Sequence, residues 1–195
     1  MTKIILRELT KCTEDQKKAV REVRNQESVR KSMYTEHEIP LNQHLAWVER
    51  LKSDNRQIVF VVLVDDKVSG VVSVSAIDRL HLKSDWAFYL DENVRGGLGA
   101  ALEFSLMNFV FNELGLEKLN CEVIETNESV VKLHKKFSFI EEGFRRENII
   151  KNQKRIGVYF LGLTKSDWLR DREKIKSRYE KVIEKFDLEI EYEPN

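Results

Sequence analysis

One glycine-rich segment in the middle of the chain has the residue types of an anion-binding site. It reads Val94-Arg95-Gly96-Gly97-Leu98-Gly99-Ala100-Ala101 and precedes a long apolar helical stretch. Glycines let successive backbone N–H groups converge on an oxyanion, and the beginning of a helix adds partial positive charge that favours a pyrophosphate. The alternative is a glycine-rich turn that only starts a helix. A dinucleotide-binding fold is disfavoured. Its G-x-G-x-x-G motif follows the first strand, whereas this loop lies in the middle of the chain and lacks the third glycine of that motif.

A second, more specific segment follows this helix. It contains Glu122, then N-x-x-V-x-x-L-H-x-K-x-S-F from Asn127 to Phe139, and then E-E-G-F at 141–144. A glycine loop that opens a long helix, followed by these motifs in this order, resembles the acetyl-CoA core of the GCN5-related N-acetyltransferases (the GNAT family). The resemblance covers about 84–144. It implies acetyl-CoA as the acetyl donor, a small-molecule amine as the acceptor and no metal.

The resemblance also assigns residues to the acetyl-CoA side. In that family, the strand before the glycine loop splays from its neighbour and its backbone pairs with the pantetheine arm, while the loop holds the pyrophosphate. Val94 stands where the family usually has arginine or glutamine, and Ser138 replaces a common glycine. The implied cofactor-binding residues are Phe88, Tyr89 and Leu90 on the strand, Arg95, Gly96, Gly97, Leu98, Gly99 and Ala100 in the loop, and Asn127 and Lys136 after it.

His134 occupies the position where the family often has a tyrosine that protonates the leaving CoA thiolate. An imidazole can do this near pH 7, because it can carry a transferable proton there. The resemblance therefore implies that His134 is the general acid. Two alternatives stay open: a histidine that only packs on its helix, and a different acid such as Tyr89 or Tyr159.

Glu122 is the preferred general base. Attack on a thioester needs a neutral amine, so an enzyme with a protonated substrate amine benefits from a base. Glu122 lies five residues before Asn127, on the strand from which some members of the family present a catalytic glutamate. Strand alternation puts it on the face opposite Cys121, so it either reaches the cleft or is an ordinary exposed carboxylate. Glu125 and Asp85 are weaker alternatives.

The N-terminal region suggests an acceptor. The stretch from Arg24 to Tyr34 and H-x-x-W-x-x-x-L at 44–51 resemble the nucleotide-sugar acetyltransferases of bacterial pseudaminic acid biosynthesis, as do W-A-F-Y-L at 86–90 and L-N-C-E-V at 119–123. The implied substrate is UDP-4-amino-4,6-dideoxy-N-acetyl-β-L-altrosamine, acetylated at its 4-amino group. Basic side chains could pair with its diphosphate, and aromatic ones could cover its uracil. The candidate substrate-binding residues are Arg24, Arg30, Met33, Tyr34 and Trp47.

Other interpretations of the same residues remain. A basic run at a helix end complements the helix dipole, and Trp47 with Leu51 has ordinary core spacing. The same CoA core would serve a protein N-terminus, an aminoglycoside or a polyamine, although a polyamine needs an acidic pocket and this region is basic. A non-catalytic CoA-binding module is the alternative from another class of protein.

The elements that must position these residues follow from hydrophobic periodicity. Valine- and isoleucine-rich runs at 58–64 and 68–77 flank Asp65-Asp66-Lys67 and predict a hairpin, and a second hairpin is expected from 139–149 and 154–163. Strands are also expected at 3–9, 86–90 and 119–124, with helices at 14–30, 42–51, from the glycine loop to about 114, and at 129–136. This order predicts an α+β (mixed α/β) class. The resemblance implies the GNAT fold, a central mixed, mostly antiparallel sheet flanked by helices.

Composition narrows the function classes. The 195 residues carry 33 basic and 33 acidic side chains, so no net field would attract nucleic acid or an acidic membrane. Cys12 and Cys121 lack the spacing of a metal site or a disulfide framework, and no signal peptide or membrane span is visible, so we expect a cytoplasmic protein. Residues 1–165 are expected to form the acetyltransferase domain. A helix through Phe186 is expected within 166–195, packed on the domain or at a homodimer contact.

Overall fold

Eight strands form one sheet in the computed structural model, which describes residues 1–94 and 96–193. The sheet order is β6-β7-β5-β4-β3-β2-β1-β8. Neighbouring strands are antiparallel except for the pairs β4–β5 and β1–β8, which are parallel, so the predicted mixed, mostly antiparallel class is confirmed. The strands are β1 (Thr2–Glu8), β2 (Ile58–Val64), β3 (Lys67–Asp78), β4 (Lys83–Leu90), β5 (Lys118–Ile124), β6 (Ile140–Lys151), β7 (Lys154–Thr164) and β8 (Phe186–Glu191).

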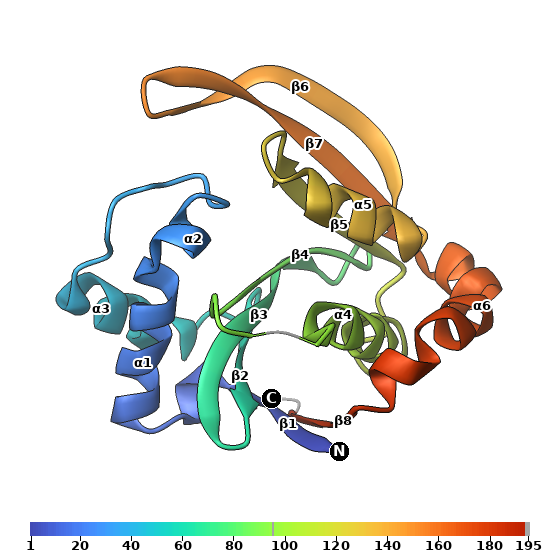
Figure 1. Ribbon diagram of the computed structural model, residues 1–195, viewed down its shortest axis with the longest axis horizontal. Coiled ribbons are helices and arrows are strands. Elements are labelled where there is room, and N and C mark those ends of the chain that lie inside the picture. Colours follow the sequence, from blue (N-terminus) through green and yellow to red (C-terminus); the bar gives the residue numbers. More distant parts are fainter. Residues whose placement is uncertain (95, 194–195) are drawn as a thin grey trace.

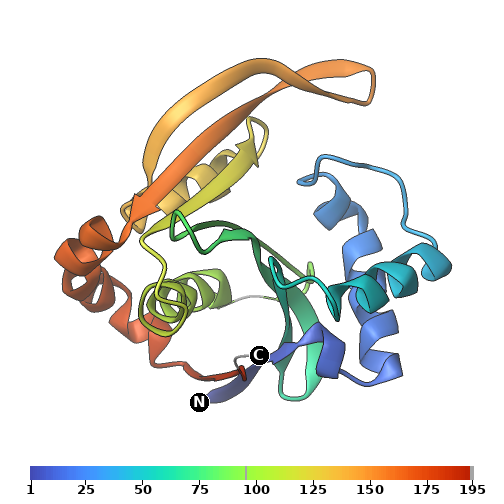
Figure 2. The same cartoon turned by 180° about the vertical axis from the view of Figure 1, so that it is seen from behind.

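Helices cover both faces of the sheet (Figure 1). On one face, α1 (Glu14–Asn25) and α3 (Leu41–Leu51) bury a core that includes Val20 and Val48, with the short α2 (Glu27–Arg30) beyond them. On the other face, α4 (Leu98–Asn108) and α6 (Lys165–Ile183) pack over a larger core that includes Leu102 and Trp168. The view from behind shows the same two layers, with α5 (Glu128–Lys136) beside β5 (Figure 2). No helix of the described part combines the length and hydropathy of a membrane span.

Both predicted hairpins are confirmed, and their turns have a simple cause. Asp65 and Asp66 have φ of 46° and 66°, and Asn152 and Gln153 have φ of 47° and 60°. Two successive left-handed residues make the turn whose twist matches that of antiparallel strands, and Asp and Asn tolerate this conformation. The second hairpin, β6–β7, extends beyond the rest of the sheet and arches toward the segment between α2 and α3 (Figure 1).

The C-terminal region corrects one prediction. The helix expected to run through Phe186 ends at Ile183, and β8 pairs in parallel with β1 from Thr2↔Phe186 to Arg7↔Glu191. The physical reason is a change of period: apolar residues alternate with charged ones along β8, and each packs against the larger core. These apolar residues are Phe186, Leu188 and Ile190 in β8 and Tyr192 directly after it. The last strand thus belongs to the same sheet as the first.

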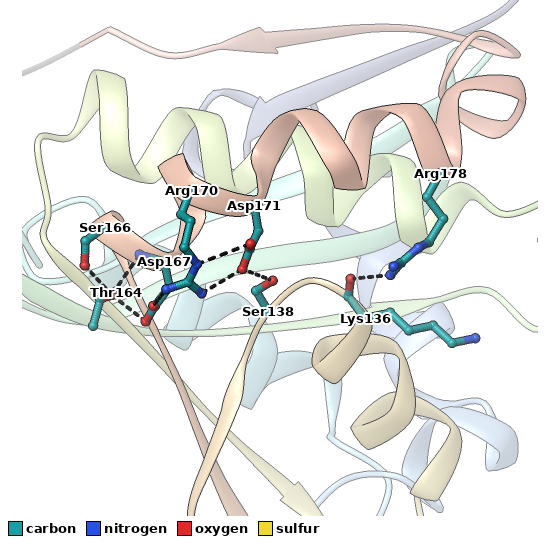
Figure 3. A network of polar contacts seen from close by, with 8 residues as sticks. All are labelled: Lys136, Ser138, Thr164, Ser166, Asp167, Arg170, Asp171 and Arg178. Carbon is teal, nitrogen blue, oxygen red and sulfur yellow. Dashed lines mark hydrogen bonds and ion pairs between the residues drawn. The ribbon is translucent and has the colours of Figure 1, made fainter.

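A polar network fixes α6 against the end of α5 (Figure 3). The Thr164 side chain caps α6 by accepting the Asp167 N–H at 3.1 Å, and the Ser138 hydroxyl donates to Asp171 at 2.9 Å. Ser138 has φ of 68°, a left-handed conformation that glycine adopts most easily. The serine at this position therefore retains the glycine-like backbone and adds a hydrogen bond to α6.

Candidate active site

The parallel strands β4 and β5 pair at one end and then separate. Their register runs only through Lys83↔Lys118, Ser84↔Leu119 and Asp85↔Asn120. Beyond this point β4 continues to Leu90 beside β3, and β5 continues to Ile124 beside β7. Each strand thus turns a backbone edge toward the gap, and such an edge can pair with an extended ligand. This is the splay that the GNAT resemblance implied.

A cavity of about 590 Å³ lies at this separation. Its walls come from β4, β5, α5 and the end of α1 with the segment after it. It brings together nine of the residues singled out from the sequence: Arg24, Met33, Tyr34, Phe88, Tyr89, Leu90, Glu122, Asn127 and His134.

The glycine loop adjoins this cavity. Gly96 and Gly97 have φ of 84° and 89°, and Gly97 is the N-cap of α4, whose first turn has no acidic residue. The first amides of a helix have no partner within the helix and attract anions. A Cβ built on Gly99 would lie 3.6 Å from Phe88 Cε2, so this turn lies against the cavity wall. Arg95, predicted to bind phosphate, lies outside the described residues.

His134 is paired with a glutamate that sequence reasoning missed. Its Nδ1 lies 2.8 Å from Oε1 of Glu103, and the ring packs on Trp86 with centroids 5.1 Å apart. Both side chains are buried. Burial raises the pKa of Glu103, and the charge of His134 opposes this shift. The signal in the sequence was a single charged residue inside an apolar helix, where an unpaired carboxylate is disfavoured.

Glu122 faces the cavity, and the Tyr34 hydroxyl donates to its Oε2. Burial and the Glu122 carboxylate raise the pKa of Tyr34, so the phenol remains the donor. Of the alternative bases, Glu125 accepts the Gly157 N–H at 2.7 Å, whereas Asp85 lines the cavity and accepts from Asn120 at 3.3 Å. Glu122 and Asp85 are therefore the carboxylates of this group that face the space.

Arg24 contributes the basic group of the cavity wall. Its Nη2 donates to the Thr35 hydroxyl at 3.1 Å, whereas its buried Nη1 has no partner among the residues that the structure describes. Burial lowers the pKa of Arg24. A buried N–H without an acceptor is destabilising, so a ligand oxygen at this position would be favoured.

The structure places three predicted residues away from the cavity. Arg30 binds the carbonyls of Asn25 and Glu36, at 2.9 and 2.6 Å, and so stabilises a loop rather than lining the site. Trp47 packs on the α1–α3 core because its helical spacing directs it inward. Lys136 is exposed, with its side chain directed away from the α6 network (Figure 3).

Lys151, also missed from the sequence, connects the tip of β6–β7 to the end of α2 and the segment after it. Its Nζ donates to the carbonyls of Arg30, Lys31 and Met33 at 2.8, 2.6 and 2.7 Å. An ammonium group has three N–H donors, and these three bonds use them all. Burial lowers the pKa of Lys151, and Glu36 opposes the shift. The contact joins residues more than a hundred positions apart in the sequence, so no local pattern predicts it.

The comparisons with known proteins agree on one family. Residues 9–158 match the family model described as an acetyltransferase (GNAT) domain. The chain is 27% identical to the prophage-derived N-acetyltransferase YokL of Bacillus subtilis, over 63% of this chain and 67% of YokL. It is 24% identical to the acetyltransferase PseH of Campylobacter jejuni, over 60% of this chain and 71% of PseH. The crystal structure of spermidine N-acetyltransferase from Vibrio cholerae, in complex with CoA and spermine, has a TM-score of 0.78 at 20% identity, covering 85% of this chain and 98% of that one.

Proposed function

The chain belongs to the GNAT family of N-acetyltransferases, and we propose that it transfers acetyl from acetyl-CoA directly to a primary amine in the β4–β5 cavity. The observation that carries this proposal is the separation of β4 from β5. It leaves a backbone edge free where His134, Glu122 and Asn127 line one space. A cavity with a few convergent polar groups is the usual form of a small-molecule site.

Acetyl-CoA binding is assigned to the side of the cavity formed by β4, α4 and α5. The pantetheine arm would pair with the backbone of Phe88–Leu90, whose edge beyond Asp85 is not paired with β5. The pyrophosphate would bind the first turn of α4 at Gly96–Ala100, where the left-handed Gly96 and Gly97 and the positive end of the helix dipole favour an anion. Asn127, the N-cap of α5, would contact the arm on the other side.

Direct transfer needs one base and one acid. Glu122 removes one proton from the substrate ammonium, directly or through a water, and the neutral amine nitrogen then attacks the thioester carbonyl carbon and loses a second proton to water as the amide forms. The C–S bond then breaks, and His134 gives a proton to the departing sulfur. Tyr34 holds the Glu122 carboxylate by a hydrogen bond, so the base has a fixed position on the cavity wall.

The proposed acceptor is the 4-amino group of a UDP-linked 4-amino-4,6-dideoxy sugar. Arg24 supports it, because its buried Nη1, which has no partner among the described residues, would bind a diphosphate or sugar oxygen. Met33 and Tyr34 line the same wall and offer apolar and aromatic surface to uracil or a methyl group. The distant similarity to PseH agrees with this acceptor.

One observation favours a second acceptor class, a polyamine. Three carboxylates line the cavity, Asp85, Glu92 and Glu122, and together they would attract a polycation. The sequence-based argument against polyamines rested on the basic N-terminal region, yet Arg30 does not reach the cavity. The carboxylates and Arg24 thus favour different acceptors.

The deciding experiment measures thiol release from acetyl-CoA with the UDP-4-amino sugar, spermidine, an aminoglycoside and a peptide N-terminus. We expect release with the UDP-sugar, and Arg24→Gln should raise KM for this acceptor about tenfold, as expected for one lost charged hydrogen bond. Lys18→Gln, an exposed charge on the same helix, is the control. Thiol release with spermidine alone would reject the UDP-sugar and identify a polyamine as the acceptor. Acetyl-CoA binding without thiol release for any amine would favour the non-catalytic module.

A further inference from the structure

Glu103 is the one charged residue of α4, and it lies in the middle of an apolar helix. It is fully buried, and one oxygen pairs with His134 Nδ1. Its other oxygen, Oε2, has no hydrogen-bond partner within the described part of the chain. A buried carboxylate with an unpaired oxygen destabilises a fold, and an apolar residue of similar volume would pack at least as well. Packing alone therefore gives no reason for a glutamate here.

We propose that Glu103 is the positioning residue of His134, and that the two side chains act as one proton-holding unit that supplies the proton to the departing CoA thiolate. This inference rests on the proposed acetyl transfer. Two contacts fix the geometry. Nδ1 is bound to Glu103, and the ring packs against both Trp86 and Phe139, with centroids 5.1 and 5.3 Å away. His134 lines the cavity, so Nε2 is the ring nitrogen left for the substrate.

The number of protons on the pair decides its role. With one proton, Nδ1–H donates to the Glu103 carboxylate and Nε2 is bare, so the pair can only accept a proton. With two protons, the pair is either an imidazolium with a carboxylate or a neutral imidazole that accepts at Nδ1 from the carboxylic acid. Nε2 carries a proton in both forms. Only this two-proton state is an acid toward the cavity. Coupled groups of this kind titrate as a pair.

The step balances as follows. The amine nitrogen forms its bond to the acetyl carbon, the C–S bond breaks, and its electron pair stays on sulfur. The Nε2 proton moves to sulfur to give CoA-SH, which leaves the pair with one proton. Nitrogen loses one proton to Glu122 before the attack and a second to water as the amide forms, and exchange with water restores the second proton of the pair.

The surroundings of the pair favour the second proton. Burial is the main cause of the raised pKa of Glu103, so this site resists becoming an isolated anion. Glu103 in turn raises the pKa of two further titratable groups, Cys121 on β5 and Tyr179 on α6. Burial raises the pKa of both, so both are neutral near pH 7. His134 is thus the charge partner of Glu103.

Steady-state kinetics of Glu103→Gln, His134→Gln and the double variant test the inference. We expect Glu103→Gln to lower kcat about tenfold or more without changing KM for acetyl-CoA, within the range of acid–base effects. The alkaline limb of its kcat profile should move to lower pH, because an amide does not hold the second proton. The double variant should have a kcat no lower than that of His134→Gln, since the effects of substituting two residues that act as a unit do not add. Glu103→Asp should recover part of the rate.

A second measurement does not depend on turnover. Long-range ¹H–¹⁵N spectra report the proton on each ring nitrogen, and His134→Gln assigns the signals among the four histidines. We expect Nδ1 of His134 to remain protonated in the wild type and to lose this preference in Glu103→Gln. Unchanged ring signals and an unchanged pH profile in folded Glu103→Gln would overturn the inference, even if acetyl transfer is confirmed. If the wild type releases no thiol with any amine, the proposed function fails first, and the assignment to thiolate protonation fails with it.

Discussion

The two sides of the cavity are built in different ways. The proposed donor side is formed by β4, α4, β5 and α5, which follow one another along the chain and carry the glycine loop, Asn127 and His134. The proposed acceptor side joins the α1–α2 region to β5 and the β6–β7 tip, through contacts such as Tyr34 with Glu122 and Lys151 with Arg30. One side is thus encoded locally and the other by tertiary contacts. Acceptor preference can therefore change through the hairpin and the α2 segment while the donor side stays intact.

Glu122→Gln tests the point where the two sides meet, and we expect the largest effect there. At pH 7 kcat should fall about 100-fold, in the lower range of general base catalysis, with KM for acetyl-CoA unchanged. Activity should recover in part at high pH, where the free amine accumulates. Tyr34→Phe, which removes only the hydrogen bond to Glu122, should have a smaller effect. A wild-type pH–rate profile for Glu122→Gln would exclude it as the base.

Gly97→Val tests the donor side alone. A Cβ at this residue would lie 2.6 Å from Val182 Cγ1, and φ of 89° adds strain. The single variant would therefore lower the stability of the fold as well as the affinity for acetyl-CoA. The double variant Gly97→Val/Val182→Ala provides space on the α6 side. We expect its affinity for acetyl-CoA, measured by calorimetry, to fall about 30-fold, or about 2 kcal/mol, with Val182→Ala as the control. A folded double variant with wild-type affinity would reject the phosphate cradle.

The same contrast explains what the sequence could predict. The hairpins and the helix after the glycine loop follow from short patterns, because periodicity and turn residues act locally. Glu122 and His134 were selected through the resemblance to the GNAT family, and strand alternation alone left the direction of Glu122 open. Glu103 and Lys151 could not be assigned a partner, since their contacts cross 31 and 121 residues of chain. Trp47 was misplaced for the opposite reason: its local pattern permits both a core and a binding role, and only tertiary packing decides. β8 was missed because the dense charges of α6 conceal the change to a period of two.

Lys151→Met tests the acceptor side alone, with a smaller expected effect. The change removes three hydrogen bonds to the backbone after α2 but keeps most of the side-chain volume. We expect KM for the acceptor to rise about fivefold to tenfold, because the wall that carries Met33 and Tyr34 is no longer held. KM for acetyl-CoA should not change. Lys154→Met, an exposed change in the same hairpin, is the matched control. A larger effect on acetyl-CoA than on the acceptor would contradict the division into two sides.

Cys121 provides the smallest expected effect and separates direct transfer from an acetyl-cysteine route. The residue adjoins the cavity next to Glu122, but its side chain is buried, and this burial, with a smaller contribution from Glu103, raises the pKa of the Cys121 thiol well above its ordinary value. The thiolate is the nucleophile, so its fraction is negligible near pH 7 and grows only as the pH approaches the raised pKa. We expect Cys121→Ala to keep kcat within about twofold, since direct transfer uses no enzyme nucleophile. Iodoacetamide should leave Cys121 unmodified at pH 7, as judged by mass spectrometry of the native protein. Loss of turnover in folded Cys121→Ala, or a trapped acetyl group on Cys121, would instead require a covalent intermediate on β5.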